Sequence, residues 1–316
     1  MKLNKIKLAL GFVTAAAMAM PIVASAAADQ EKAMKNSANW AHPRGQHDNQ
    51  GYSKLTQINK GNVKNLKAAW TLSTGVNRGH EGSPLVIGNM LYVHTAFPNN
   101  VYALDLNNNQ KVVWSYFPKQ DPSVQAVLCC DNVNRGLGFG NGKIFLQQND
   151  GNLVALNAKT GAKVWSTLNT DPKVGATNTN APHVIKDKVL TGCSGAEFGV
   201  RCFIAAYNIE DGSLAWKAMS TGPDSEVLIG ADFNKENPLY SALSVYEDVN
   251  GGNTEGGSFK KIPTSQLKGG ETDLGIKTWL KPQAVKDGWQ HGGGSTWGWW
   301  PYDAKTNLVY YGTGNP

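Results

Sequence analysis

The chain has 316 residues, of which 41% are hydrophobic and 17% charged, and its formal net charge is +6. This length can bury a sizeable core, and the 35 glycines and 10 tryptophans indicate many tight turns and many large apolar anchors. After residue 28 the sequence has no run of five like charges and no apolar stretch long enough to span a bilayer. These features argue against nucleic-acid binding and against a membrane span.

The first 28 residues have the pattern of a secretory signal peptide. Lys2, Lys5 and Lys7 precede the apolar run "LALGFVTAAAMAM", and the small residues "VASAAA" follow it, which predicts cleavage near Ala26 to Ala28. A membrane anchor is the alternative, but the apolar run is shorter than the roughly 20 residues that a spanning helix needs. Cleavage would lower the formal charge from +6 to +3 and would deliver residues 29–316 to an oxidising compartment, where four cysteines can form two disulfides.

A repeated segment dominates the middle of the chain. "NVYALDLNNNQKVVW", "NLVALNAKTGAKVW" and "FIAAYNIEDGSLAW" each read as a strand, a polar turn and a second strand, and their final tryptophans follow one another at intervals of 51 residues. These are Trp114, Trp165 and Trp216. Weaker copies are "NLKAAW", ending at Trp70, and "PYDAKTNLVYYGTG", in which Tyr310 or Tyr311 would take the closing position.

Together with intervening strands such as "GKIFLQQ" and "HVIKDKVLTG", the repeat gives about four strands per period, as in a propeller blade. A two-sheet sandwich is the alternative, but it gives no reason for the equal spacing of the tryptophans. We therefore predict an all-β propeller in which the recurrent tryptophan wedges between neighbouring blades. Residues 217–290 are too long and too polar for one blade strand, so we expect an insertion there, with a short helix near "NPLYSALSVYEDV".

Six motifs occur in an order and spacing that resemble the pyrroloquinoline-quinone (PQQ) alcohol dehydrogenases, and in particular their methanol dehydrogenase branch: "GHEGSPLV", "LCCDNVNRG", "GATNTNAPHV", "GCSGAEFGVRC", "GGGSTWGWWPYD" and "YYGTGNP". The resemblance implies an eight-bladed propeller. The chain has room for about four or five blades, so we interpret residues 29–316 as the N-terminal part of a longer propeller, about its first half.

The adjacent pair Cys129 and Cys130 poses a geometric problem, because consecutive Cα atoms lie about 3.8 Å apart, below the usual disulfide range of about 4.4–6.8 Å. Two reduced thiols, or pairing of each cysteine elsewhere, are the alternatives. The resemblance implies a vicinal disulfide that covers one face of the quinone. It places Trp297 against the other face, where an indole suits stacking, and leaves Trp299 and Trp300 to pack between blades.

The resemblance assigns the rim of the cofactor to one arginine, one glutamate, three hydroxyl side chains and two small residues: Arg135, Glu81, Thr179, Ser194, Ser295, Gly195 and Ala196. An arginine fork and hydroxyl donors suit a ligand that carries three carboxylates. Where this chain has Ser295 the family commonly has threonine, and the hydroxyl is retained. For Glu81 the alternative is a turn carboxylate that bonds the local backbone.

Glu197 and Asn315 match two metal ligands of the family, and their oxygens suit calcium or a trivalent lanthanide. In isolation either residue would more often be a surface polar group. "GAEFGVRC" and the insertion favour the lanthanide branch. The catalytic base, an aspartate in the family, is expected beyond Pro316, so no catalytic residue is assigned. We expect a Cys193–Cys202 disulfide to brace the Glu197 loop. The six histidines show no ligand spacing, and we expect structural roles for them.

The resemblance implies a periplasmic quinoprotein that oxidises methanol or another short primary alcohol to the aldehyde and passes electrons to a c-type cytochrome. It also implies a homo-oligomer when full length and no nucleic-acid partner. We expect residues 29–316 alone to be inactive. The alternative is a non-catalytic periplasmic propeller that serves as a scaffold in outer-membrane assembly. Such a scaffold shares the Trp-ended repeat but has no need for vicinal cysteines, a stacking tryptophan or a pair of metal-binding oxygens.

Overall fold

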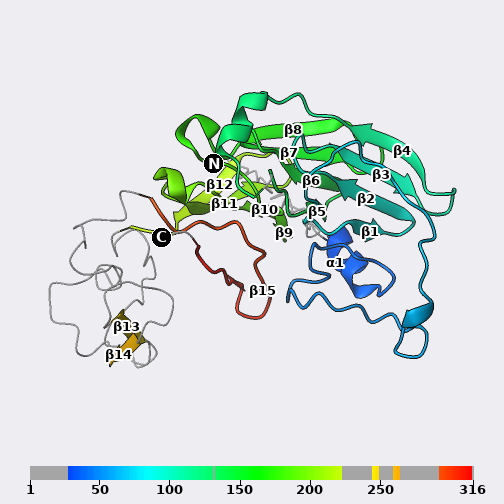
Figure 1. Cartoon of the computed structure of the whole chain (residues 1–316), viewed down its shortest axis with the longest axis horizontal. Coiled ribbons are helices and arrows are strands. Elements are labelled where there is room, and N and C mark those ends of the chain that lie inside the picture. Colours follow the sequence, from blue (N-terminus) through cyan, green and yellow to red (C-terminus); the bar gives the residue numbers. More distant parts are fainter. Residues whose placement is uncertain (1–27, 131, 223–243, 249–258, 264–291, 315–316) are drawn as a thin grey trace, which may run out of the picture.

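The computed structural model of the chain describes residues 28–130, 132–222, 244–248, 259–263 and 292–314 (Figure 1). Its helical elements are α1 (Ala28–Lys35) and the 3-10 turns η1 (Val63–Asn65), η2 (Pro122–Val127), η3 (Pro172–Val174) and η4 (Ala196–Phe198). All other regular structure in the described residues is β, which confirms the predicted fold class.

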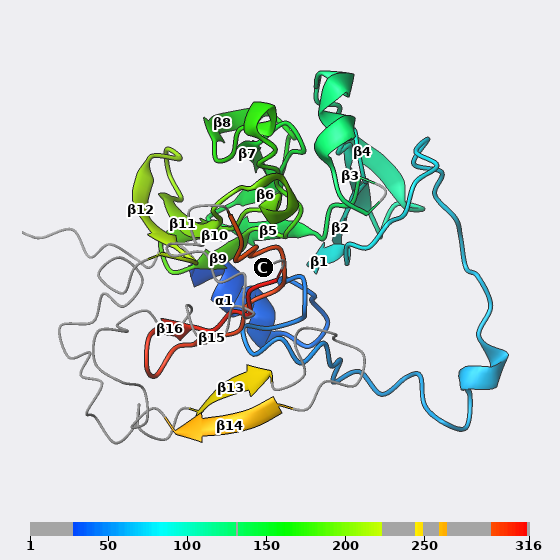
Figure 2. The ribbon, with the colours of Figure 1, turned by 60° about the vertical axis from the view of Figure 1, so that its left-hand side comes forward.

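Three four-stranded antiparallel sheets form the body of the molecule. The first contains β1 (Leu85–Ile87), β2 (Met90–His94), β3 (Val101–Asp105) and β4 (Lys111–Tyr116). The second contains β5 (Leu137–Gly140), β6 (Lys143–Gln147), β7 (Asn152–Asn157) and β8 (Lys163–Leu168). The third contains β9 (His183–Ile185), β10 (Lys188–Thr191), β11 (Phe203–Asn208) and β12 (Leu214–Met219). Figure 2 shows the sheets side by side like a fan, with β1, β5 and β9 innermost, so each sheet is one blade.

The repeated tryptophans occupy the same register in all three blades. Trp114 pairs with Ala103, Trp165 with Ala155 and Trp216 with Ala206, and in each blade the register shifts directly after the paired alanine. The 51-residue period of the sequence is therefore a period of the structure.

The predicted wedge between blades is confirmed for the first two tryptophans. Trp114 Nε1 donates to the carbonyl oxygen of Ala158 in the second blade at 3.0 Å, and Trp165 Nε1 donates to that of Ile209 in the third blade at 3.2 Å. Each indole also lies on the turn glycine of the next blade, since a Cβ on Gly161 would be 2.6 Å from the ring of Trp114.

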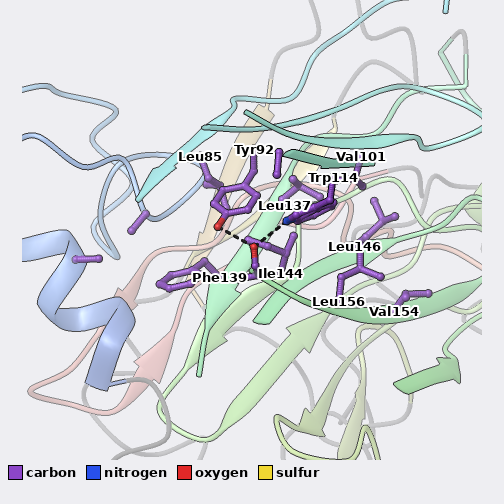
Figure 3. Packing of buried hydrophobic residues seen from close by; sticks show 14 residues of the cluster. Leu85, Tyr92, Val101, Trp114, Leu137, Phe139, Ile144, Leu146, Val154 and Leu156 are labelled. Carbon is purple, nitrogen blue, oxygen red and sulfur yellow. Dashed lines mark hydrogen bonds between the residues drawn. The ribbon is translucent and has the colours of Figure 1, made fainter. Parts of the chain in front are cut away.

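The core lies between the blades. Leu85, Tyr92 and Trp114 of the first blade pack against the second blade. Tyr92 and Trp114 both donate to the carbonyl oxygen of Ala158, and Figure 3 shows their two side chains pointing to the same place. A second cluster joins Phe145 and other residues of the second blade to the third. Each fully buried side chain of this size contributes roughly 1.5–3 kcal/mol through removal of apolar surface from water.

The short elements outside the three blades are β13 (Ser244–Asp248), β14 (Phe259–Pro263), β15 (Tyr302–Asp303) and β16 (Leu308–Val309), which pair as two separate hairpins. The helix expected near residues 237–249 is wrong for residues 244–248, because "SVYED" forms β13 paired with β14. The adjacent residues Val245 and Tyr246 are both of types that favour an extended strand. Of the other residues of the expected insertion, 217–219 complete β12 and 259–263 form β14, whereas 223–243, 249–258 and 264–290 lie outside the described residues, as does the signal peptide except Ala28 in α1.

The two weaker copies of the repeat are not Trp-ended hairpins. Residues 66–70 form no strand, and the side chain of Trp70 is 40% exposed. The innermost edge of the first blade pairs instead with Trp40, through a bridge to Val86. In the C-terminal copy the paired strands end at Val309, and the amide of Tyr310 continues the pairing by donating to the carbonyl oxygen of Pro301 at 3.0 Å.

Candidate functional site

The loop that precedes β5 carries a disulfide between Cys129 and Cys130, whose Cα atoms are 3.8 Å apart. The expected vicinal bridge is therefore confirmed. The loop turns sharply at this point, since Cys130 has a φ of 57° and the amides of Asn132 and Val133 both donate to the carbonyl oxygen of Cys129, at 3.0 and 3.4 Å. Cys130 is exposed and Cys129 is partly buried, so the disulfide presents a surface to solvent.

Polar contacts from η2 and the first blade hold this loop. The side-chain oxygen of Gln125 accepts from Asn132 Nδ2 at 3.3 Å and from Arg78 Nη2 at 3.2 Å. The amide of Phe97 donates to the carbonyl oxygen of Asn132 at 3.1 Å. The loop that carries the cysteine pair is thus held by segments that precede it in the chain.

Arg135 is the centre of the predicted rim. Its Nη1 donates to Thr179 Oγ1 at 3.0 Å, and its Nε lies 3.5 Å from Glu81 Oε2. Its guanidinium carbon lies 4.6 Å from the ring centre of Trp297, a cation–π distance. Thr179 Oγ1 is in turn 2.7 Å from Ser194 Oγ. The structure therefore brings together five residues that the motifs place far apart in the sequence.

The electrostatics of this cluster follow from burial. Arg135 is 8% exposed, and burial lowers the pKa of its guanidinium, whereas the nearby carboxylate of Glu81 opposes that change. An arginine in a protein remains protonated. The cluster therefore holds a largely buried cation whose main carboxylate partner, Glu81, has a side chain that is 46% exposed. Such a cation is suited to bind a further anionic group.

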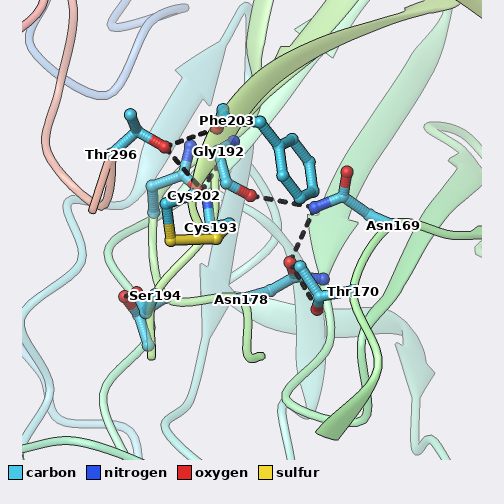
Figure 4. The surroundings of a disulfide bond; sticks show 11 residues. Asn169, Thr170, Asn178, Gly192, Cys193, Ser194, Cys202, Phe203 and Thr296 are labelled. Carbon is cyan, nitrogen blue, oxygen red and sulfur yellow. Dashed lines mark hydrogen bonds between the residues drawn. A yellow bond between two sulfur atoms is a disulfide. The ribbon is translucent and has the colours of Figure 1, made fainter. Parts of the chain in front are cut away.

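A second, conventional disulfide supports the Glu197 loop. Cys193 and Cys202 are bridged as expected, with Cα atoms 5.4 Å apart, and both lie in the core between the second and third blades (Figure 4). The loop between them begins at Ser194 and Gly195. Gly195 has a φ of 112°, and a Cβ there would lie 2.1 Å from the carbonyl oxygen of Gly175, so only glycine fits.

The segment with Ser295 and Trp297 is fastened to this disulfide by its neighbour Thr296. The Thr296 hydroxyl accepts from the amide of Cys193 at 2.9 Å and donates to the carbonyl oxygen of Phe203 at 2.7 Å, and the amide of Thr296 donates to the carbonyl oxygen of Cys193 at 2.9 Å (Figure 4). These bonds place Ser295 and Trp297 at the third blade although more than 90 residues separate them from Cys193 in the sequence.

Two side chains on this segment carry groups that suit a ligand, the buried hydroxyl of Ser295 and the exposed indole of Trp297. Ser295 is 1% exposed, and its hydroxyl has no hydrogen-bond partner among the described residues, whereas its backbone pairs with Gly314. Trp297 is 38% exposed and lies against Gly314, since a Cβ there would be 3.1 Å from Trp297 Nε1. A buried hydroxyl without a partner fits a polar ligand atom.

The remaining tryptophans of "STWGWW" have structural surroundings, as expected. Trp300 is 2% exposed and stacks on His183 with ring centres 5.0 Å apart. Trp299 lies beneath the guanidinium of Arg44, whose central carbon is 5.4 Å from the ring centre.

The two predicted metal ligands are less defined. Glu197 is exposed on η4, and Asn315 lies outside the described residues. Within those residues, no group of three or more histidine, cysteine, aspartate or glutamate side chains is suited to hold a metal ion. The geometry therefore defines the rim around Arg135 better than a metal centre.

Sequence reasoning missed three residues that build the site, namely Gly192, Thr296 and His94. Gly192 allows Thr296 to approach, because a Cβ on Gly192 would lie 2.3 Å from the carbonyl oxygen of Thr296. His94, for which only a generic structural role was expected, contacts the segments that carry Glu81 and Arg135. Gly192 and Thr296 lie within the motifs "GCSG" and "STW", whereas His94 has no signal in the sequence.

Comparison with known proteins identifies the family of the chain. Residues 40–237 match the family model for the PQQ glucose/ethanol/alcohol dehydrogenase β-propeller domain. The chain is 46% identical over 288 residues to methanol dehydrogenase [cytochrome c] subunit 1 of Methylorubrum extorquens, which covers 89% of the chain and 41% of that protein. It is 47% identical over 296 residues to a lanthanide-dependent methanol dehydrogenase of the same species, covering 93% and 44%.

Among solved structures, a europium-containing methanol dehydrogenase matches with a TM-score of 0.75 and 45% identity, covering 91% of this chain and 44% of that one. The chain therefore spans less than half the length of these relatives.

Proposed function

The chain belongs to the PQQ family of glucose, ethanol and alcohol dehydrogenase β-propeller domains, and on that basis we propose that the protein is a periplasmic quinoprotein that oxidises methanol or another short primary alcohol. The observation that carries the proposal is the cluster in which Arg135 contacts Glu81, Thr179 and Trp297. A scaffold needs no buried cation of this kind. The names of the relatives, methanol dehydrogenases of cytochrome c-linked and lanthanide-dependent types, support the same reaction.

The residues present fit PQQ, a planar molecule with three carboxylates. Arg135 would bind a carboxylate through its fork, and the hydroxyls of Thr179, Ser194 and Ser295 would donate to further oxygens. The buried Ser295 hydroxyl without a partner supports this assignment. Gly195 and Ala196 leave room at the rim, and Glu81 would orient Arg135. Trp297 and the Cys129–Cys130 disulfide would cover the two faces of the ring.

When bound, PQQ supplies the two-electron acceptor for the alcohol. The chain's own residues bind and orient this acceptor, keep Arg135 positively charged beside it, and exclude water with the indole and the disulfide. We propose that Glu197 and Asn315 contribute oxygen ligands to calcium or a lanthanide ion, since both are hard cations. The homology to lanthanide-dependent enzymes supports the lanthanide. A c-type cytochrome is the proposed electron acceptor.

The proposed location rests on residues 1–28, which we interpret as a signal peptide, with residues 29–316 as propeller and an insertion at about 217–290. In the described residues, no helix combines the length and the apolar character needed to cross a membrane. A homo-oligomer is proposed by analogy with the family.

The test compares two arginines that each stack on a tryptophan. Arg135→Ala should raise the Kd for PQQ at least tenfold, because it removes a charged donor from a buried site. Arg44→Ala, which loses the contact with Trp299, is the matched control and should leave that Kd within about twofold. The Kd is measured by quenching of tryptophan fluorescence by PQQ in the presence of Ca²⁺ or La³⁺. Equal affinity in the two variants, or no binding to the unaltered protein, would reject the proposal.

The metal assignment has its own test. Glu197→Ala should lower the bound metal measured after equilibration with La³⁺, because a cation loses a charged ligand. Glu210→Ala, which removes an exposed carboxylate paired with Lys143, should not. Equal metal content in both variants would assign Glu197 to the surface.

A further inference from the structure

His94, the last residue of β2, is buried between the first and second blades and lies outside every motif of the site. It is 5% exposed, and its Nε2 lies 3.1 Å from the carbonyl oxygen of Asn134. A carbonyl oxygen only accepts, so the proton of the neutral ring is on Nε2. The other nitrogen, Nδ1, has no hydrogen-bond partner in the described part of the chain. His94 therefore makes one directed bond, and that bond reaches the residue before Arg135.

The ring of His94 also supports the residue after Glu81. A Cβ on Gly82 would lie 1.9 Å from His94 Cε1 and 2.1 Å from Nε2, and 3.2 Å from the backbone carbon of Arg135. The imidazole thus contacts the backbone of Gly82 while it bonds to Asn134. Ser83 and Gly136, the residues that follow Gly82 and Arg135, form a parallel bridge.

These contacts place His94 where the two halves of one ion pair meet. Glu81 is on the segment that leads into the first blade, and Arg135 is on the segment that leads into the second. Their side chains lie 3.5 Å apart, a distance that depends on the spacing of the two backbones. A ring that fits between Gly82 and Asn134 fixes that spacing.

We propose that His94 is a positioning residue for the cofactor site, which holds Glu81 and Arg135 at the separation needed to bind the carboxylate of a planar quinone. The inference rests on the proposed function for the identity of the ligand, but its structural part does not. Burial lowers the pKa of His94 to about 4, so the ring is uncharged at neutral pH and adds no second cation beside Arg135. It supplies a donor and a rigid plane without competing for the anion.

Tyr92 provides a matched control for simple blade packing. It lies two residues earlier on β2, is 4% exposed, and donates its hydroxyl to a carbonyl oxygen of the second blade, that of Ala158, at 3.1 Å. Tyr92→Phe and His94→Leu each remove one buried hydrogen bond between the same two blades. Only His94 bonds to the segment that carries Arg135.

The first measurement is the Kd for PQQ in the presence of Ca²⁺, with the urea midpoint measured in parallel. His94→Leu should raise the Kd about tenfold, whereas Tyr92→Phe should change it less than twofold although both variants are less stable. His94→Gln should restore affinity to within about threefold, because the glutamine amide can donate from the position of His94 Nε2. Equal Kd values for His94→Leu and Tyr92→Phe would overturn the proposal.

The second measurement needs no quinone. Amide hydrogen exchange of peptides covering residues 79–84 and 132–136 should be at least fivefold faster in His94→Leu than in Tyr92→Phe, since local opening tracks the loss of local contacts. If the unaltered protein does not bind PQQ, the proposed function fails and this exchange measurement alone decides the role of His94. Should His94→Leu not fold, His94→Asn, whose shorter amide does not reach Asn134, replaces it. Unchanged exchange in these peptides would reject the positioning role.

Discussion

Cys193 and Cys202 are 1% and 0% exposed and lie in the core between the second and third blades, whereas Cys129 is partly buried and Cys130 exposed on the loop before β5. The Cys193–Cys202 disulfide closes a loop over a sequence separation of nine residues, whereas the Cys129–Cys130 disulfide joins neighbours. A disulfide stabilises a fold mainly by restricting the unfolded chain, and the effect grows with the length of the loop. The two bonds should therefore differ in what they contribute to stability.

The surroundings of the two disulfides differ as well. The buried bond is tied into the structure by Thr296 and by the backbone of Gly293, which accepts from the amide of Cys202 at 3.1 Å. The vicinal bond is held at the edge of its loop and faces outward. One disulfide therefore fixes the segments that carry Ser194 and Trp297, and the other is exposed where it is proposed to cover the cofactor.

The largest expected effect is on the buried bond. Replacing both residues in Cys193→Ala/Cys202→Ala should lower the free energy of unfolding by about 2–5 kcal/mol, because loop closure and core packing are both lost. PQQ affinity should fall as well, since the backbone groups of Cys193 and Phe203 that hold Thr296 are no longer braced by the disulfide. Urea unfolding under non-reducing conditions measures the change. A midpoint equal to that of the unaltered protein would contradict the assigned role.

Acid should act on the same region through His183, whose ring stacks on Trp300 next to Gly192. Burial lowers the pKa of His183 to about 3 and that of His94 to about 4, from the ordinary 6.5. Between these values the unfolded chain binds protons that the folded chain does not, so stability falls as the pH falls below 6.5. We expect a loss of roughly 1–2 kcal/mol per histidine between pH 6.5 and pH 5.

The check on this prediction is the slope of stability against pH. Replacement of the titrating group in His183→Phe should flatten that slope, whatever its effect on stability at pH 7.5. An unaltered slope in urea unfolding series at pH 7.5, 6.5 and 5 would show that His183 does not titrate in this way.

An effect of similar size is expected where Thr296 approaches the buried disulfide. In Gly192→Ala the new Cβ would lie 2.3 Å from the carbonyl oxygen and 2.4 Å from the hydroxyl of Thr296, so the segment must shift, at a cost of about 1–3 kcal/mol. Gly312→Ala is the control, since nothing lies within 4 Å of a Cβ there. If the two variants have equal thermal midpoints, the close approach at Gly192 is not a constraint.

The parts of the fold that could be predicted are those encoded locally. The Trp-ended hairpins recur because strand, turn and strand are contiguous, and the turns carry their own signals, such as Asn157, whose side chain accepts from the amides of Lys159 and Thr160. The prediction failed at Trp70 and at residues 244–248, where the extended or helical state depends on a partner strand that the local sequence does not specify.

The candidate site also has residues that could be predicted from the sequence and residues that could not. The motifs identified Arg135, Thr179 and Ser194, and the structure brings them into contact. The supporting residues could not be predicted, because their evidence is a contact between distant segments. His94 and Asn134 are 40 residues apart, and Thr296 and Cys193 are 103 apart. Neither spacing leaves a pattern in a single sequence.

The smallest effect on stability, and the sharpest test of the comparison, concerns the vicinal bond. Cys129→Ala/Cys130→Ala should change the free energy of unfolding by less than about 1 kcal/mol, because a bond between neighbours restricts the unfolded chain very little. The Kd for PQQ should nevertheless rise several-fold, since the surface proposed to cover one face of the ring is lost.

The two double variants should therefore differ in the ratio of lost stability to lost affinity. The ratio should be large for the variant at residues 193 and 202 and small for the variant at residues 129 and 130. Urea unfolding and fluorescence titration on the same preparations give both quantities. A large fall in the unfolding midpoint of Cys129→Ala/Cys130→Ala, with PQQ affinity unchanged, would reverse the comparison and make the vicinal disulfide a structural bond.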